Sequence, residues 1–329
     1  MRIKGFGINA DALKAGDGCE TLAFDFDALA RNLEHYAQLG FDCVEIPLHR
    51  MGAMACGKLL PPQVKKICGI LNQFPFRYTV HAPDLLNLMD RENVSWQKKA
   101  LEECIEFAKT IGATILVCHS GRYVPDEIIP LSENCKGKPD KKVMDKMLAL
   151  ERELLLEAAE KAEELGVTIA LENAQPYLDR SPYCYAEIPS LLKEQVATVN
   201  HPNVKIALDI GHAYLASKFY KFNFLMEIAC TVPFIGHVHL HDNFGRVSRT
   251  DEKDKADLMT AGRGDLHLPI GFGEIPAREV LVLLRDCPCV ILHEIHSSPR
   301  DYIKEALELT KNILLSNASN APERKRMVI

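Results

Sequence analysis

Histidine and acidic side chains recur at the ends of apolar segments in this chain, or in the loop just beyond them. His81 closes RYTVH, His119 closes TILVCH, and Glu172 closes TIALE. The full set of such residues is His81, His119, Glu172, Asp209, His212, His239, Asp265, His267 and Glu294. Imidazole and carboxylate together are the ligands of zinc, manganese and similar divalent ions. An acid inside an apolar segment is costly to bury unless it is paired or binds a cation, so this pattern predicts a divalent-metal site.

The elements that must position these residues alternate between strands and helices. Apolar runs of strand character span 4–9, 43–48, 77–82, 114–120, 168–173, 204–212, 235–243 and 289–295. Amphipathic segments with the 3.6-residue helical period cover 24–39, 95–111, 141–165 and 300–315. Alternation of this kind predicts a parallel sheet, and eight units predict a closed (β/α)8 TIM barrel of the α/β class. A doubly wound open sheet is the alternative, but no G-x-G-x-x-G follows the first run to support a dinucleotide-binding version.

A barrel also explains why ligands scattered along the sequence would meet. Parallel strands bring their C-terminal ends to one mouth, where barrel enzymes place their chemistry. We expect one barrel domain over 1–315 and a polar, disordered tail over 316–329. Two long connections, 121–140 and 244–264, follow strands on the mouth face. The second is charged and contains glycine, so we expect a mobile lid or a partly disordered loop there.

The alternation of side chains along a strand separates the histidines of HVHLH. His237, His239 and His241 all point to one face of the pleat, at three different depths. We expect His239 to lie level with the other candidate ligands, with His237 deeper in the barrel and His241 nearer the loop. In the last strand, His293 points away from Glu294, which predicts that His293 packs between the barrel and its helices.

Composition limits the classes of partner. A protein that binds nucleic acid normally carries a basic stripe, because contacts to phosphate supply most of the affinity. The net charge of −6 therefore makes nucleic acid the less favoured partner. No apolar run approaches the roughly 20 residues that span a bilayer, and the N-terminus lacks the apolar core of a signal peptide. We expect a cytoplasmic protein with no membrane partner.

The motifs resemble those of the xylose-isomerase-like barrels, which include sugar isomerases and epimerases and the apurinic endonucleases of the endonuclease IV type. The resemblance covers about 3–315, and its most specific pieces are VHAPDLLNL, LENA, LDIGHAYLA, HVHLHDN, DLHLPIGFGEI and ILHEIHS. It implies that one metal is held by Glu172, Asp209, His239 and Glu294. The endonuclease type would add ions at His81 and His119, with Glu172 bridging, and at His212, Asp265 and His267. Up to three ions of Mn, Zn, Co or Mg are thereby implied.

The sugar branch fits better than the endonuclease branch. The stretch after Glu172, NAQPYLDRSPY, lacks the glycine-rich run expected of the endonucleases, whereas HDNFGR and DLHLPIGFG resemble the isomerases and epimerases. We therefore expect an isomerase or epimerase of a sugar, sugar phosphate or cyclitol, acting through an enediolate. Glu172 and Glu294 would be the catalytic proton-transferring pair. Three alternatives stay open: a multinuclear zinc phosphodiesterase, a metal-dependent lyase or dehydratase on a keto-sugar, and a non-catalytic binding barrel.

Loop position near the metal suggests which side chains contact the substrate. The candidates are Asn173, His241, Asp242, Asn243 and Arg246. Arg246 is suited to a phosphate or carboxylate on the substrate, although a solvated lid face explains Arg246, Arg249 and Arg263 equally well. The expected partner is a small sugar-like molecule, and the resemblance adds a homo-oligomer as a further expectation.

Overall fold

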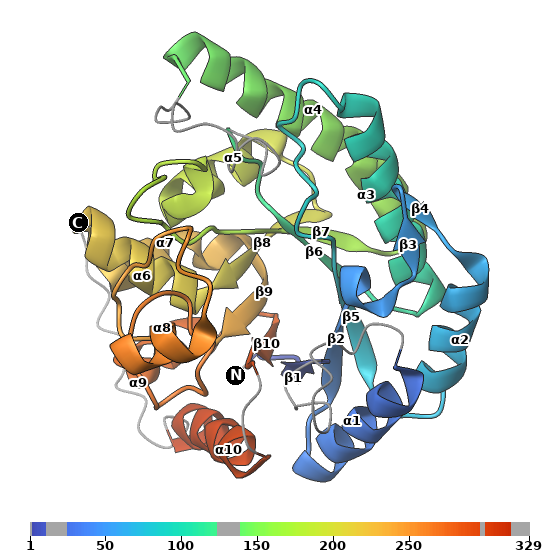
Figure 1. The fold of residues 1–329 in the computed structure, drawn as a ribbon, viewed down its shortest axis with the longest axis vertical. Coiled ribbons are helices and arrows are strands. Elements are labelled where there is room, and N and C mark those ends of the chain that lie inside the picture. The colour runs from blue at the N-terminus through green and yellow to red at the C-terminus, as the bar shows by residue number, and fades with distance from the viewer. Residues whose placement is uncertain (1, 11–24, 124–138, 297–299, 317–329) are drawn as a thin grey trace.

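The computed structural model describes residues 2–10, 25–123, 139–296 and 300–316, which form a closed parallel barrel ringed by helices (Figure 1). Each strand pairs in parallel with its two neighbours, in the order β1-β10-β9-β8-β7-β6-β5-β2. The barrel strands are β1 (Gly5–Asn9), β2 (Cys43–Pro47), β5 (Arg77–His81), β6 (Ile115–His119), β7 (Thr168–Glu172), β8 (Val204–Asp209), β9 (Ile235–Leu240) and β10 (Val290–His293). The predicted (β/α)8 barrel is confirmed, and every barrel strand lies within a predicted run.

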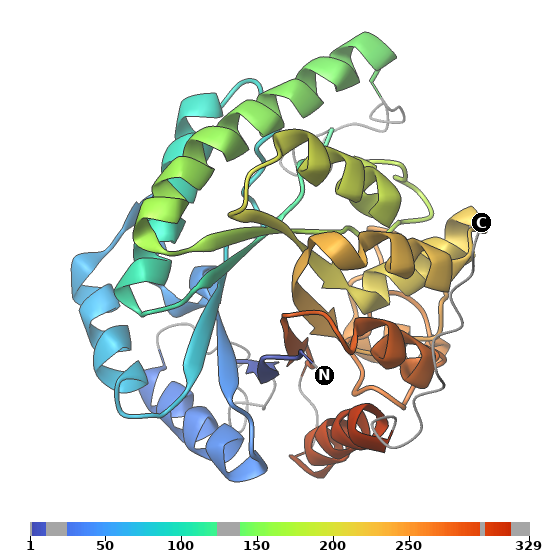
Figure 2. The same ribbon diagram turned by 180° about the vertical axis from the view of Figure 1, so that it is seen from behind.

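Helices cover the outside of the barrel on all sides, as the front and back views show (Figures 1 and 2). They are α1 (Phe26–Leu39), α2 (Pro61–Leu71), α3 (Val94–Thr110), α4 (Lys141–Leu165), α5 (Pro189–Val199), α6 (Ile210–Tyr220), α7 (Phe224–Thr231), α8 (Lys255–Ala261), α9 (Ala277–Leu284) and α10 (Arg300–Ser316). Short 3-10 turns occur at η1 (Leu48–Met51), η3 (Tyr185–Glu187) and η4 (Val232–Phe234), and β3 (Met54–Ala55) pairs with β4 (Lys58–Leu59) in a small hairpin. None of the described helices is both long and apolar enough to cross a membrane.

Local sequence sets where the helices stop and start. The helix α4 begins after Asp140, whose carboxylate accepts a hydrogen bond from the Val143 N–H, and ends at Gly166 with φ of 71°. Gly40 ends α1 in the same left-handed conformation, with φ of 87°. An L-residue with a side chain is strained at such angles, which is why glycine is the usual helix-ending residue.

The side chains inside the barrel change from apolar to polar along strands β6, β7 and β8. Val117, Ala170 and Ala207 form a small, fully buried apolar cluster inside the barrel. Two residues further along the same strands stand His119, Glu172 and Asp209, which face the same side because side chains alternate along a strand. The register aligns them, since His119 pairs with Glu172 and Asp209 pairs with His239. The fold thus seals the lower barrel with small side chains and gathers the polar ones at the C-terminal mouth.

Of the two long connections that follow β6 and β9, the structure describes only the second in full. Most of 121–140 lies outside the described residues, as does the tail after Ser316. The segment 244–264, which we expected to be a mobile or partly disordered lid, contains the helix α8. Asp254 caps that helix through its carboxylate, and Gly262 ends it. Lys255 of α8 places its Nζ 3.2 Å from Nδ1 of His296, so this segment reaches the barrel mouth.

Candidate metal centre at the barrel mouth

Three carboxylates converge on one imidazole nitrogen at the mouth. The Nδ1 atom of His239 lies 3.1 Å from Oε1 of Glu172, 3.1 Å from Oε2 of Glu294 and 3.9 Å from Oδ2 of Asp209. His239 and Asp209 are fully buried, and Glu172 is 2% exposed. The four side chains come from β7, β8, β9 and the residue after β10. They are the four residues that the resemblance assigns to a shared ion, and the fold brings them together.

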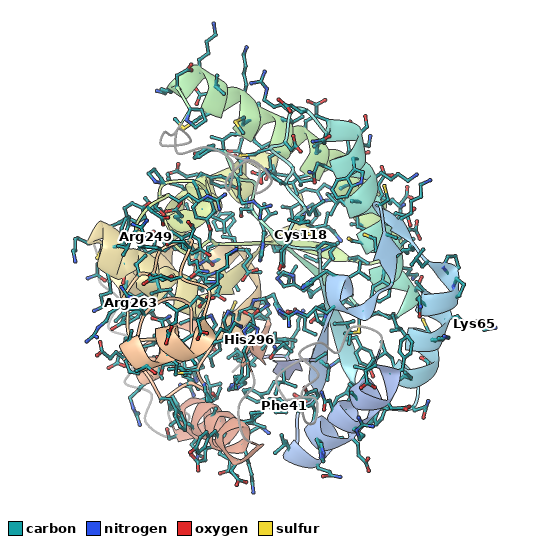
Figure 3. All side chains as sticks on the ribbon, viewed as in Figure 1. Phe41, Lys65, Cys118, Arg249, Arg263 and His296 are labelled. Carbon is teal, nitrogen blue, oxygen red and sulfur yellow. The ribbon has the colours of Figure 1, made fainter. Side chains whose placement is uncertain are left out.

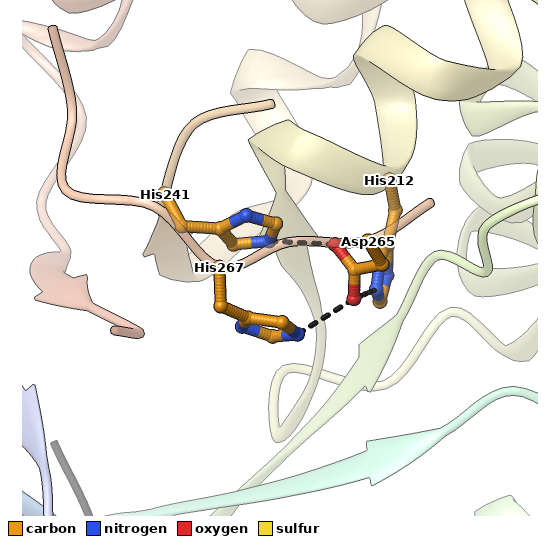
Figure 4. Close-up of side chains that lie close together, drawn as sticks. All are labelled: His212, His241, Asp265 and His267. Atoms are coloured by element: carbon orange, nitrogen blue, oxygen red, sulfur yellow. Dashed lines mark hydrogen bonds and ion pairs between the residues drawn. The ribbon is translucent and has the colours of Figure 1, made fainter. Parts of the chain in front are cut away.

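Two further groups flank this centre. On one side, Nε2 of His81 and Nε2 of His119 lie 3.2 and 3.3 Å from Oε2 of Glu172. On the other side, Nε2 of His212 and Nε2 of His267 lie 3.1 and 2.6 Å from Oδ2 of Asp265. Figure 4 shows these side chains grouped around Asp265. All nine predicted ligand residues therefore lie in one continuous array. Glu172 belongs both to the centre and to the His81 group.

Backbone carbonyl groups fix the orientation of three of these histidines. His81 directs Nδ1 to the Ala82 carbonyl oxygen at 2.8 Å, and His212 directs Nδ1 to the Asn173 carbonyl oxygen at 2.8 Å. His267 does the same toward the carbonyl oxygen of Glu294 at 3.1 Å. A carbonyl only accepts, so each Nδ1 must carry the proton. In the neutral ring Nε2 then carries no proton, so it is the nitrogen available to a metal ion, as in metal-ligating histidines.

Burial and charge pull the pKa values in this array in opposite directions. Burial alone would lower the pKa of His81, but the carboxylate of Glu172 raises it to about 10. Burial likewise opposes the charged form of His267, while Asp265 and Glu294 raise its pKa to about 9. Burial would raise the pKa of Glu172, yet the surrounding imidazoles lower it well below its usual range. Without a cation, the acids are thus balanced by protonated imidazoles, and a bound metal would replace those protons.

The array opens into a cavity of about 330 Å³. Its walls include Glu172, Glu294, His119, His212, Asp265 and His267 from the array, together with Glu45, His49, Arg50, Arg122, Gln175, Arg180 and His296. A volume in this range accommodates a small metabolite. Figure 3 shows His296 near the barrel axis, with Arg249 and Arg263 off to one side. Those two arginines form ion pairs within the segment 244–264, with Asp251 and Glu252 respectively.

Most of the residues predicted to contact the substrate do not line this cavity. Among Asn173, His241, Asp242, Asn243 and Arg246, Asn173 alone is among the residues that line this cavity. Its amide donates to the Asp209 carbonyl and accepts from the Asp209 N–H, so it ties β7 to β8. His241 is fully buried, with Nε2 3.0 Å from Oδ2 of Asp209.

The last three of these residues hold loops in place. The Asp242 carboxylate accepts hydrogen bonds from the backbone N–H groups of Asn243, Gly271 and Ile275. The Asn243 amide donates to the Gly211 carbonyl, and its oxygen accepts from the Gly245 N–H. Arg246 donates to the Ala261 carbonyl at 3.5 Å and is exposed.

Sequence reasoning missed Glu45 on β2. This residue is 2% exposed and lies between His237 and His239. The signal was present, because Glu45 stands in the apolar run CVEIP just as Glu172 stands in TIALE. His49, which lines the cavity beside His81, gave no comparable signal because it follows its strand in a short 3-10 turn.

Comparison with known proteins places this chain in a family. The family model described as xylose isomerase-like TIM barrel matches residues 33–313. The uncharacterised protein MJ1311 of Methanocaldococcus jannaschii is 28% identical over 275 residues, which are 82% of this chain and 79% of that protein.

Two solved structures share the fold over nearly their whole lengths. A D-tagatose 3-epimerase-like protein is 25% identical, with a TM-score of 0.67 over 96% of this chain and all of the other. A xylose isomerase-like TIM barrel protein of Mycobacterium smegmatis in complex with magnesium is 17% identical, with a TM-score of 0.63 over 95% and 97% of the two chains. Because the family model matches well over half of the sequence, the chain belongs to the xylose isomerase-like TIM barrel family.

Proposed function

We propose that this protein is a divalent-metal-dependent isomerase or epimerase of a sugar-like substrate. The observation that carries the proposal is the convergence of Glu172, Asp209 and Glu294 on Nδ1 of His239. The D-tagatose 3-epimerase-like neighbour supports a sugar substrate, and the magnesium complex of the mycobacterial neighbour supports a divalent metal.

The donor atoms fit a shared metal ion. Ligand atoms that each lie about 2.1 Å from one ion sit about 3.0 to 3.5 Å apart at tetrahedral or octahedral angles. The two 3.1 Å separations around Nδ1 of His239 match this spacing. A ring nitrogen carries at most one proton, which cannot serve three carboxylates at once. Within the described residues, no hydrogen bond satisfies the buried atoms Oε2 of Glu294 and Oδ1 of Asp265.

Glu172 and Glu294 would transfer the substrate proton. When bound, the metal would act as a Lewis acid on a substrate carbonyl and its neighbouring hydroxyl, which stabilises the enediolate. One carboxylate removes the proton beside the carbonyl, and the other returns it on the opposite face or to the neighbouring carbon. His119 is the better aid to Glu172, because its Nε2 lies 3.3 Å from the carboxylate. His212 is less suited, since its Nδ1 is directed to the Asn173 carbonyl.

The cationic part of the cavity wall favours an anionic substrate. Arg50, Arg122 and Arg180 line the cavity. Arg122 is held by the Asp84 carbonyl at 2.8 Å, and Arg180 stacks over the Tyr183 ring at 4.3 Å. A guanidinium matches phosphate and carboxylate geometry with paired N–H donors. We therefore extend the proposal to a phosphorylated or carboxylated sugar, recognised by this wall rather than by Arg246.

A multinuclear phosphodiesterase is the second candidate. It is favoured by one observation, the fixed orientation of His81, His212 and His267, which leaves three further Nε2 atoms beside Glu172 and Asp265 as potential metal ligands. Bridged ions would generate hydroxide and clamp a transferring phosphate.

Metal content distinguishes the two candidates. We expect about one tightly held equivalent for the isomerase, whereas near three equivalents together with cleavage of a duplex containing an abasic site would favour the phosphodiesterase. A wild-type protein that binds no Mn²⁺, Zn²⁺, Co²⁺ or Mg²⁺ overturns both.

Proton exchange tests the mechanism. The Mn²⁺-loaded protein is incubated in D2O with a panel of ketoses and ketose phosphates, and deuterium beside the carbonyl is measured by mass spectrometry. We expect exchange with a phosphorylated or carboxylated member and none in Glu172→Gln. Glu151→Gln is the matched control, because Glu151 is equally buried but lies on α4 outside the array. Exchange that persists in Glu172→Gln removes Glu172 from its proposed role.

A further inference from the structure

Glu45 projects into the barrel from a strand that is not a neighbour of the strand carrying His239. It lies on β2, which is separated from β9 by β1 and β10 in the closed strand order. Its carboxylate nevertheless meets two histidines of β9, with Oε1 3.0 Å from Nε2 of His239 and Oε2 3.2 Å from Nε2 of His237. An anion buried this deeply is stable only with partners of this kind.

The contact with His239 involves the nitrogen that faces away from the candidate metal ligands. Nδ1 of His239 faces Glu172, Asp209 and Glu294, and Nε2 faces Glu45. A neutral imidazole carries one proton, and a metal binds only the nitrogen without it. The side chain must therefore be held in the tautomer with hydrogen on Nε2 if Nδ1 is to bind an ion.

We propose that Glu45 is the positioning residue for His239. Its Oε1 lies 3.0 Å from Nε2 as an ion-pair contact without hydrogen-bond geometry, and it accepts the Nε2 proton when an ion binds, which holds the ring with the Nδ1 lone pair directed at the shared ion of the metal centre. This inference rests on the proposed metal-dependent function. Glu45 is not itself a ligand of that centre, because the two nitrogens of one imidazole point in widely different directions.

The reason for a carboxylate here lies in the barrel geometry. His81, His212 and His267 direct Nδ1 to backbone carbonyls in loops or at strand ends. His239 instead stands within β9 and points to the barrel axis, where the carbonyls of the strands are engaged in the sheet. A side chain from across the barrel can reach Nε2, and a charged acceptor also makes the ring a stronger donor to a metal.

The orientation of Glu45 is itself fixed from two sides. Thr79, its register partner on β5, donates its hydroxyl to Oε2 at 3.0 Å. His237 contacts the same oxygen, which leaves Oε1 directed at His239. The carboxylate is thus held before any ion binds, so that binding costs little reorganisation.

Metal affinity of matched variants tests the proposal. Metal-free wild type, Glu45→Gln, Glu45→Leu and Glu151→Gln are titrated with Mn²⁺ by calorimetry, and the folding of each is checked by circular dichroism. Loss of such a supporting group typically weakens metal binding about 10- to 100-fold. We expect a loss of that size in Glu45→Leu and a smaller one in Glu45→Gln, which keeps one acceptor oxygen. Glu151→Gln should bind like wild type.

A spectroscopic measurement reports on the tautomer without relying on affinity. In the Zn²⁺-loaded protein labelled with ¹⁵N-histidine, His239 should give a slowly exchanging Nε2–H signal shifted downfield by its carboxylate acceptor. Glu45→Gln should move that signal upfield and speed its exchange, and Glu151→Gln should leave it unchanged. Glu45→Gln keeps the size of the side chain, so this test stands even if Glu45→Leu does not fold.

Three results would overturn the inference, and they are distinguishable. Unchanged Mn²⁺ affinity and an unchanged Nε2–H signal in folded Glu45→Gln would leave the proposed function intact but remove Glu45 from its role. Loss of one whole equivalent of metal, with the remaining affinity unchanged, would make Glu45 a ligand of a separate ion with His237 and His239. Absence of metal binding in the wild type would overturn the proposed function and the inference together.

Discussion

Replacing Gly211 with alanine tests how tightly the polar array is packed. Gly211 is the second residue of α6, directly behind the strand that carries Asp209. A Cβ atom there would lie 1.9 Å from Cε1 of His241. The ring has little room to retreat, because it is fully buried and stacks on His267 with ring centres 4.2 Å apart. Relief of the clash requires a shift of roughly 1.5 Å to restore ordinary contact at about 3.5 Å.

The free-energy cost follows from overpacking. Insertion of a methyl group into a filled site costs typically about 1–3 kcal/mol, and the helical preference of alanine over glycine returns at most about 1 kcal/mol. We expect Gly211→Ala to destabilise the fold by about 2 kcal/mol, which is about 3 °C in Tm for a chain of this length. The shift of His241 also disturbs its contact with Asp209, so Mn²⁺ affinity should fall as well.

Gly69→Ala is the matched control, since Gly69 is an exposed helical glycine in α2 whose added Cβ meets nothing within 4 Å. This variant should gain up to about 1 kcal/mol from helix preference alone. Both variants are compared by calorimetric melting of the metal-free protein and by Mn²⁺ titration. If Gly211→Ala melts at or above the wild-type temperature, as Gly69→Ala should, then His241 is not packed against Gly211 as described.

Two further predictions concern buried acids outside the candidate centre. Asp242→Ala should destabilise the fold by at least about 3 kcal/mol. The substitution leaves three backbone N–H groups without the acceptor that the Asp242 carboxylate provides. Asp242→Asn should be intermediate, and equal melting temperatures of wild type and Asp242→Ala would contradict this account. Burial raises the pKa of Glu151, so the folded state holds that proton more tightly than the unfolded chain, and stability attributable to Glu151 falls as pH rises above the ordinary carboxyl range. The stability difference between wild type and Glu151→Gln should therefore shift against wild type with rising pH, and a flat difference from pH 4 to 8 would refute it.

Much of the fold and of the candidate ligand set could be predicted from the sequence because both depend on local patterns. Apolar runs alternating with helical periodicity predict parallel strands, and the closure of such strands brings their C-terminal ends together. His81, Glu172 and Asp209 could be placed at the mouth because each ends such a run. The two-residue alternation of HVHLH likewise put His239 level with them, between His237 and His241.

The tertiary structure decided what each polar side chain touches, because those contacts join segments that no local pattern relates. Glu45 meets His239 across the barrel only once β1 and β10 close the sheet between them. The loop that follows β9 folds back on Asp242, which turned an expected substrate contact into an acceptor for backbone N–H groups. Sequence periodicity determines which face of its element a side chain lies on. Closure of the barrel and the folding of loops back onto it determine which side chain or backbone group that residue contacts, and this contact determines its chemical role.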